Sequence, residues 1–335
     1  MPGINSGRRA PSNGDSREKS ASFPSAVTDR VKAPQVSVIV AAIDAAASID
    51  ECLRSVQVSL ADLDSELIVA DASNDGTAAR VERDFPGVPV IRMPTGTLAP
   101  RLWSAGLAQA RGDRIAFMTA HSAVLPGWIG ALTEALNAGA GGAGGPLVLK
   151  ENSSLTDAAI YFLRYSAFMP TFRDSPYPAA EIAGDNSMYH GNLLRTHMAS
   201  FADGFWEVPF HSILRAQGKT LTMVPAATID FGQSFTLGAI SSQRFAHGRH
   251  FGKWRVSAAG LGRARIILAA PIVPFVLMTR ILRRAVAASA ATQADRQAAS
   301  RPQPVSLSRL MAASPVILWL GACWAFGEAL GAWEG

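Results

Sequence analysis

The stretch that decides the fold lies between residues 35 and 77, where the chain reads QVSVIV from Gln35 to Val40 and ELIVADASNDGT from Glu66 to Thr77. Both runs are rich in β-branched apolar residues, which is typical of buried strands. Between them, residues 49–60 carry apolar side chains at helical spacing. This order predicts a βαβ unit with parallel strands. Ligands bind beyond the carboxyl ends of such strands, so the acidic, turn-rich end of the second run is the first candidate site.

Strand and helix patterns continue to alternate, which predicts an α/β fold with one mostly parallel central sheet and covering helices. We expect strands at residues 36–40, 67–70, 88–93, 114–118 and 147–149, and helices at residues 49–60, 77–85, 99–111, 128–138, 155–168 and 208–217. The glycine-rich run at residues 138–146 is interpreted as a flexible loop or a boundary between two halves. Residues 1–33 contain few large apolar side chains and are expected to be a disordered tail.

The composition narrows the class of partner. The chain has 335 residues, of which 48% are hydrophobic and only 17% charged, so part of it is expected to contact lipid. Its net charge of +5 suits anionic lipid headgroups or nucleotide diphosphates. No basic run is interleaved with stacking aromatic residues, so nucleic acid is not an expected partner. The two cysteines, Cys52 and Cys323, form no disulfide framework, which fits a reducing compartment, and no secretory signal is expected at the N-terminus.

Two apolar segments follow residue 260. Residues 266–279 are about fourteen in number, short of the ~20 that cross a bilayer as a helix. Residues 310–327 form a longer uncharged run, and several arginines lie between the two segments. We expect the first segment to be interfacial or re-entrant, and the second to lie at the interface or to cross once. The alternative is a soluble protein whose C-terminal helices pack on its own core.

Four segments together resemble family 2 glycosyltransferases over residues 35–255: the first βαβ unit, RIAFMTAHS from Arg114, FWEVPFHSILRAQG from Phe205, and the basic run SSQRFAHGRHFGKWR from Ser241. The resemblance implies the GT-A-like nucleotide-diphospho-sugar transferase fold. It divides residues 34–255 into a donor half, residues 34–145, and an acceptor half, residues 146–255, followed by membrane-associated helices over residues 256–335. It also implies transfer of a sugar with inversion.

The resemblance assigns the donor nucleotide to two acids. Asp71 matches the family's uracil-contacting acid, which favours a UDP-sugar, and Asp44 matches a polar position where the first strand meets the nucleotide. A turn residue or helix N-cap is the plain alternative for Asp71, and turn chemistry is the preferred interpretation of Asp75.

The family's metal-binding Asp-x-Asp is replaced here by Thr119-Ala120-His121. The resemblance leaves three hypotheses for His121: a ligand of a divalent ion such as Mn²⁺ or Mg²⁺, an imidazolium that stabilises the leaving phosphate, or a site that has lost both metal and activity. The plain alternative is a structural histidine that is hydrogen-bonded at the end of a strand. Arg101 is a candidate phosphate contact or a solvated arginine.

Glu207 matches the family's catalytic acid and is the expected general base. A favourable charge at a helix N-terminus is the alternative. Trp206 is expected to stack on the acceptor or sugar, or to be a core residue. Arg244, His247 and Arg249 are expected to neutralise the nucleotide diphosphate, with a lipid-docking collar as the rival. Asp185 and Asn186 are acceptor-side candidates, or members of a turn.

The predicted protein is an inverting glycosyltransferase at the cytoplasmic face of the membrane, acting on a lipid-linked or cell-envelope acceptor in polysaccharide biosynthesis. A catalytically impaired nucleotide-binding scaffold is the second hypothesis, motivated by the missing Asp-x-Asp. A purely structural membrane-interface protein is the third. A dinucleotide-binding enzyme is disfavoured because no glycine-rich turn follows the first strand.

Overall fold

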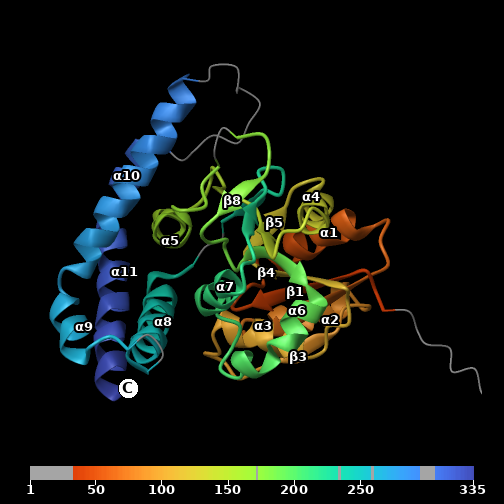
Figure 1. Ribbon diagram of the computed structural model, residues 1–335, viewed down its shortest axis with the longest axis horizontal. Coiled ribbons are helices and arrows are strands. Elements are labelled where there is room, and N and C mark those ends of the chain that lie inside the picture. Colours follow the sequence, from red (N-terminus) through yellow and green to blue (C-terminus); the bar gives the residue numbers. More distant parts are fainter. Residues whose placement is uncertain (1–32, 171–172, 233–234, 258–259, 295–305) are drawn as a thin grey trace, which may run out of the picture. The chain divides into compact units, whose positions relative to one another are not determined.

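The computed structural model describes residues 33–170, 173–232, 235–257, 260–294 and 306–335. The expected disordered tail lies outside these residues, apart from Ala33. The central feature is an eight-stranded sheet with the order β3-β2-β1-β4-β9-β6-β10-β8 (Figure 1). Its first four strands, which are all parallel, are β1 (Val36–Ala42), β2 (Ser65–Asp71), β3 (Val90–Arg92) and β4 (Arg114–Thr119).

The rest of the sheet has mixed strand directions. Strand β9 (Asn186–His190) pairs antiparallel with both β4 and β6 (Gly142–Gly144). Beyond β6 lie β10 (Leu221–Met223), which is parallel to it, and β8 (Tyr177–Ala179), which is antiparallel to β10. The expectation of a single sheet was wrong, because β5 (Ser122–Val124), β11 (Ile229–Phe231) and β7 (Leu147–Leu149) form a second, three-stranded sheet.

The glycine-rich run at residues 138–146 is not a flexible linker. It contains the buried strand β6, and a Cβ atom added at Gly142 would lie 2.5 Å from the ring of Tyr189. A Cβ atom at Gly145 would lie only 1.7 Å from the carbonyl oxygen of Ala227. Glycine is therefore required here for close packing rather than for flexibility.

Helices cover both faces of the central sheet. One face packs against α1 (Ile49–Leu60), α4 (Trp128–Asn137) and α5 (Leu155–Tyr165), and the other against α3 (Ala99–Leu107) and α7 (Glu207–Ala216). Alternate residues of β1 join the two cores, as the two-residue period of a strand requires. The shorter α2 (Thr77–Asp84) and α6 (Gly191–Thr196) complete this part of the chain.

The C-terminal part is helical and packs onto α5. It consists of α8 (Leu237–Ser257), α9 (Arg263–Ala269), α10 (Val273–Ala294) and α11 (Leu307–Glu334), and α11 contacts α5, α8, α9 and α10. Helices α8 and α11 run parallel, since Ser241 bonds to Trp319 near one end and Lys253 pairs with Glu334 at the other.

Glycines allow α8 and α11 to approach closely. Cβ atoms added at Gly248 and Gly252 of α8 would lie 2.0 and 2.1 Å from backbone oxygens of α11. Cβ atoms at Gly327 and Gly331 of α11 would lie 2.1 and 1.9 Å from backbone oxygens of α8. Each helix therefore presents a Gly-x-x-x-Gly face to the other, a pattern that permits backbone contact.

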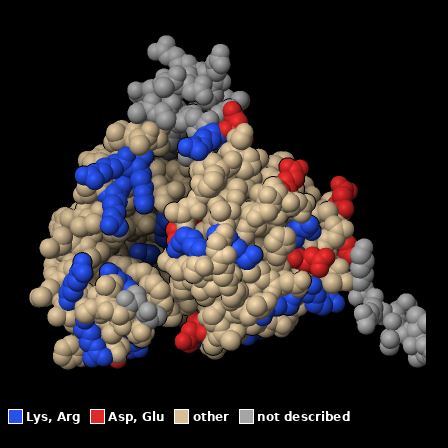
Figure 2. All heavy atoms as spheres, in the orientation of Figure 1, with Lys and Arg blue, Asp and Glu red and all other residues tan. Residues whose placement is uncertain are grey.

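The C-terminal helices also carry surface features suited to lipid. By length and composition, α11 could cross a membrane, and so could α9 and residues 273–289 of α10 if they form one span bent by 69°. Large apolar side chains are exposed at Phe275, Trp319 and Phe326. Figure 2 shows Lys and Arg side chains gathered over the region where α9 and α10 lie in Figure 1.

Substitution of Gly248 tests the close contact between α8 and α11. We expect Gly248→Ala to lower the free energy of unfolding by about 1–3 kcal/mol, because the new methyl group overlaps the facing backbone. Gly238→Ala in the same helix is the control: nothing lies within 4 Å of its Cβ position. That variant should be neutral or stabilising by less than about 1 kcal/mol. Thermal unfolding in detergent measures both, and equal midpoints would contradict the packing.

Candidate active site

The carboxyl ends of β1 and β2 form a polar rim. Asp71 is the last residue of β2; it is buried, and it accepts a hydrogen bond of 2.6 Å from the Ser73 hydroxyl. Burial raises the pKa of Asp71. Asp44 adopts a left-handed conformation, with φ of 49°, and its backbone N–H donates to the same Ser73 hydroxyl. The structure thus brings Asp44 and Asp71 together at the expected edge of the sheet.

Asp75 stabilises the turn that follows β2. Its carboxylate accepts hydrogen bonds from the backbone N–H and the hydroxyl of Thr77 and from the backbone N–H of Ala46. These bonds agree with the preferred interpretation of Asp75 as a turn residue.

The residues at the Asp-x-Asp position have separate environments. Thr119 ends β4, and its hydroxyl donates a 3.4 Å hydrogen bond to Asp185. His121 is buried with its ring edge against Phe235, 4.4 Å between ring centroids. Burial, assisted by the charge of Arg164, lowers the pKa of His121 to about 3. A pKa this low favours a neutral ring at physiological pH and disfavours the imidazolium hypothesis.

A buried ion pair lies next to Thr119. The carboxylate of Asp185 accepts hydrogen bonds of 3.0 and 3.1 Å from Nη2 of Arg164, at the C-terminal end of α5, and a further bond from the hydroxyl of Tyr165. Burial opposes the charge of Arg164, but Asp185 raises the pKa of the guanidinium, so it stays protonated. Sequence reasoning missed Arg164; its only signal was a cation within an otherwise apolar helix pattern.

A cavity of about 200 Å³ joins this ion pair to Glu207. Its lining includes Arg164, Asp185, Trp206, Glu207, Arg244 and His247. Glu207 is the first residue of α7, and burial, followed by the charge of Asp185, raises its pKa. A carboxylate with a raised pKa is a stronger base and suits proton abstraction.

Helix α8 contributes one charged and one neutral group to the cavity. Burial, followed by the charge of Arg164, lowers the pKa of Arg244 to about 10, so its guanidinium remains protonated. Burial, followed by the charges of Arg164 and Arg244, holds the pKa of His247 well below its ordinary value. The lowered pKa favours a neutral His247, which can still donate a hydrogen bond to a phosphate, so its expected role at the diphosphate stays a prediction.

A buried network of polar side chains holds α7, the helix that carries Glu207. His211, one turn into α7, contacts the hydroxyl of Tyr189 at 2.7 Å through Nε2 and the carboxylate of Glu181 at 2.5 Å through Nδ1. Tyr189 belongs to β9, so this network ties α7 to the central sheet. Glu207 is thereby placed on a rigid element.

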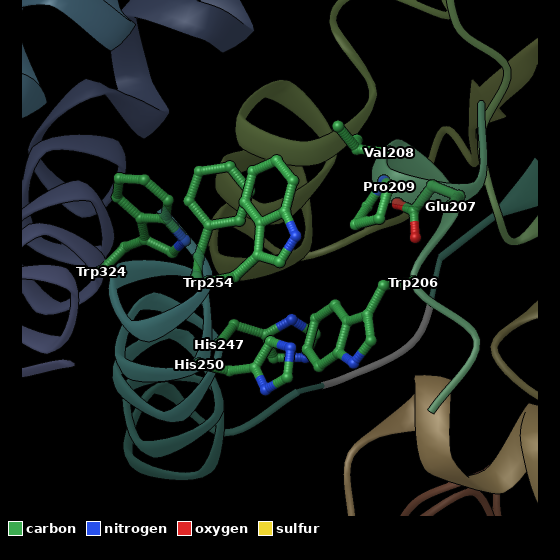
Figure 3. Close-up of a pocket in the computed structure, with 9 residues that line it drawn as sticks. Trp206, Glu207, Val208, Pro209, His247, His250, Trp254 and Trp324 are labelled. Carbon is green, nitrogen blue, oxygen red and sulfur yellow. The ribbon is translucent and has the colours of Figure 1, made fainter. Parts of the chain in front are cut away.

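An aromatic groove of about 180 Å³ adjoins the cavity and shares Trp206, Glu207 and His247 with it. Figure 3 shows the carboxylate of Glu207 facing the side chains that α8 contributes. Trp206 stacks on His250 at 3.8 Å between ring centroids, and Phe251, Trp254 and Trp324 also line the groove. A third cavity of about 380 Å³ continues from Trp206 and Trp254 toward Phe201 and Ile213.

Three expected site residues lie elsewhere. Arg101 is exposed and pairs with Asp203 at 3.3 Å. Arg249 lies on the α11 side of α8, where it pairs with Glu334 at 2.7 Å, so it does not serve the cavity. Asn186 is fully buried and fills a structural role: its amide bonds to the carbonyl oxygen of Ala227 and accepts from the indole of Trp128. Each of these three side chains thus has a partner within the described part of the chain.

The residues present do not fit a divalent metal ion. Across the described ranges, no three His, Cys, Asp or Glu side chains gather into a metal-binding group. Mg²⁺ and Mn²⁺ prefer carboxylate, carbonyl and water oxygens, and the nearby carboxylate of Asp185 is already bound by Arg164. Among the described residues, His121 thus has no second His, Cys, Asp or Glu group with which to hold a metal ion.

Comparisons with known proteins gave one family match and similar solved structures. Residues 37–197 match the sequence model described as glycosyl transferase family 2. The mannosyltransferase PcManGT from Pyrobaculum calidifontis, solved with GDP-Man and Mn²⁺, is similar at a TM-score of 0.50 and 16% identity, over 90% of this chain and 88% of that one. Residues 1–349 of S. aureus TarS, solved with UDP, are similar at a TM-score of 0.43 and 13% identity, over 63% of each chain.

A comparison with curated protein sequences found no significant match. The family match covers the first βαβ unit, the Thr119–His121 position and Asp185, all of which the structure places around one end of the sheet. This chain therefore contains a glycosyl transferase family 2 domain over residues 37–197, in an α/β fold similar to that of the mannosyltransferase.

Proposed function

We propose that the protein is an inverting glycosyltransferase that moves a sugar from a nucleoside diphosphate donor to a lipid-linked or cell-envelope glycan acceptor. The observation that carries this proposal is the position of Glu207, a carboxylate with a raised pKa that lies in the wall between two connected spaces. One space contains the Arg164–Asp185 pair beside the strand ends, and the other is aromatic.

The donor is assigned to the strand ends. Asp71 and Thr119 lie at the carboxyl ends of β2 and β4 with β1 between them, so their backbones are about 10 Å apart. That separation is comparable with the extent of a nucleotide from its base to its diphosphate. Asp71 would bind the base, for which uracil is the first choice, and the diphosphate would lie toward the cavity of Arg164.

The transfer follows from this order of groups. Glu207 takes the proton of the acceptor hydroxyl while the hydroxyl oxygen bonds to the anomeric carbon. The bond from that carbon to the donor phosphate breaks on the opposite face, and its electron pair leaves with the nucleoside diphosphate. Attack and departure on opposite faces invert the anomeric configuration.

The acceptor is assigned to the aromatic groove. Trp206, Trp254 and Trp324 offer flat apolar faces on which a sugar or a lipid chain can pack, and Trp324 belongs to α11. The same helix is long and apolar enough to cross a membrane. The preceding helix, α10, exposes Arg280, Arg283 and Arg284. These features support an acceptor presented at the cytoplasmic face of a membrane.

Replacement of Glu207 tests the general base. We expect Glu207→Gln to lower kcat by about 10²- to 10⁴-fold with nucleotide affinity unchanged, because the amide cannot accept the proton. Release of UDP or GDP from a panel of nucleotide sugars, with a bacterial lipid extract as acceptor, is the measurement. Glu134→Gln, an exposed position on α4, is the matched control. Nucleotide binding without transfer in the native protein would favour the scaffold hypothesis.

The pH dependence of kcat/KM reports the same carboxyl. Glu207 must be ionised to act as a base, so activity should fall as the pH drops through its pKa. Since burial raises that pKa, the acid limb should lie above the ordinary value of about 4.3. The neutral His121 and His247 should add no limb near about 6.5. An acid limb at or below about 4.3 would contradict the assignment.

Vesicle flotation tests the membrane assignment. We expect the protein to float with vesicles that contain phosphatidylglycerol, and to do so less at high salt, because the arginines of α10 attract anionic headgroups. The Arg280→Glu/Arg283→Glu variant should bind anionic vesicles more weakly than the native protein. A protein that stays unbound with every vesicle would rule out a membrane-presented acceptor while leaving the transferase chemistry open.

A further inference from the structure

Two arginines from different helices meet in the cavity beside Glu207. Arg164 comes from the end of α5 and Arg244 from the first half of α8, and both line the same space. Arg164 pairs with Asp185 at 3.0 Å. Arg244 has no such carboxylate: among the described residues its Nε atom is buried without any hydrogen-bond partner. A buried guanidinium with an unsatisfied donor requires an explanation.

One positive charge in the cavity lacks a paired carboxylate. The carboxylate of Asp185 already serves Arg164, Tyr165 and Thr119, and among the described residues no ion pair joins Arg244 to Glu207. The charge of Arg164 contributes to the lowered pKa of Arg244, which is the effect expected of two like charges close together. An anion placed between the two guanidinium groups would remove this repulsion and satisfy the free donor.

The same charges exclude the usual alternative of a bound divalent cation. A cation near Thr119 would have to share Asp185 with the guanidinium of Arg164, which repels it. The only nitrogen offered at the second position of the motif is that of His121, and one imidazole is a poor site for Mg²⁺ or Mn²⁺. The residues therefore favour an anion in this space over a metal ion.

We propose that Arg164 and Arg244 bind the diphosphate of the donor directly and take the place of a divalent metal ion. This inference rests on the proposed function, and it identifies the cationic groups that bind the donor diphosphate. As the bond between the anomeric carbon and the phosphate oxygen breaks, the electron pair stays on that oxygen, and the two guanidinium groups stabilise the resulting charge. Arginine suits this role because its planar donors bind phosphate oxygens in pairs.

Calorimetric titration of the full-length, detergent-solubilised protein tests the absence of a metal requirement. UDP and GDP are titrated in EDTA and again in Mn²⁺. We expect the dissociation constant of the nucleotide that binds to agree within about twofold between the two conditions. Binding that disappears in EDTA and returns with Mn²⁺ would overturn the inference and leave the proposed function standing.

Substitution of Arg244 tests the residue assignment. Arg244→Met should weaken UDP or GDP binding in EDTA by about 10- to 100-fold, and should change binding of the nucleoside by less than about twofold. Arg249→Met is the control. Arg249 lies five residues after Arg244 on the same helix, and its guanidinium pairs with Glu334 outside the cavity. Equal affinities of the Arg244→Met variant and the native protein would overturn the inference.

Arg164 needs a paired substitution because its removal alone would leave the buried carboxylate of Asp185 without its cation. The Arg164→Met/Asp185→Asn variant keeps the cavity close to neutral, and it should lose nucleoside diphosphate affinity to an extent similar to Arg244→Met. Circular dichroism confirms that the variant is folded. A folded double variant with native affinity would overturn the role of Arg164.

A lipid phosphate has the same chemistry as the donor diphosphate, and inorganic pyrophosphate and farnesyl phosphate separate the two sources. Pyrophosphate should bind in EDTA, depend on Arg244 and be displaced by UDP or GDP. If the binding of farnesyl phosphate depends on Arg244 and the binding of nucleotides does not, the donor assignment is overturned. Pyrophosphate binding with no affinity for any nucleotide would reject the proposed function as well, although the anion site itself would remain.

Discussion

The buried carboxylate of Asp185 is the group on which the site depends. It lies just before β9 and accepts hydrogen bonds from α5, through Arg164 and Tyr165, and from β4, through Thr119. An unpaired carboxylate here would be costly, so the Asp185 contacts favour the packing of α5 against the sheet. The pair also sets the protonation of its neighbours: Asp185 helps to raise the pKa of Glu207, and Arg164 helps to lower those of His121, Arg244 and His247.

Helix α11 holds the two arginine-bearing helices in place. It packs against both α5 and α8, and Arg309 near its start donates to the backbone carbonyls of Glu151 and Ser153, which precede α5. Trp324 from the same helix enters the aromatic groove. The C-terminal helices are therefore part of the site as well as the part of the chain best suited to lipid.

Local patterns predicted local structure well. The helix at residues 49–60 has the expected ends because its buried residues recur at helical spacing, and Asp71 ends its strand because the apolar run stops there. Long-range contacts were not visible in the sequence. The run at residues 138–146 looks like a linker until Tyr189 is placed against Gly142, and Arg164 looks incidental until Asp185, 21 residues away, is found beside it. Arg249 and Arg244 differ only in which side of α8 they occupy.

The glycine contact between α8 and α11 orders the events of biosynthesis. A ribosome delivers the strands that carry Asp44 and Asp71 first, and these can begin to fold as they emerge. Helix α8 emerges later, and its partner comes later still; Ser241 and Trp319, which bond to one another, are 78 residues apart. The nascent chain can thus complete its polar rim well before the cavity of Glu207 acquires the wall that α8 supplies. The contact with α11 that holds this wall forms later still, after α9 and α10 have been made.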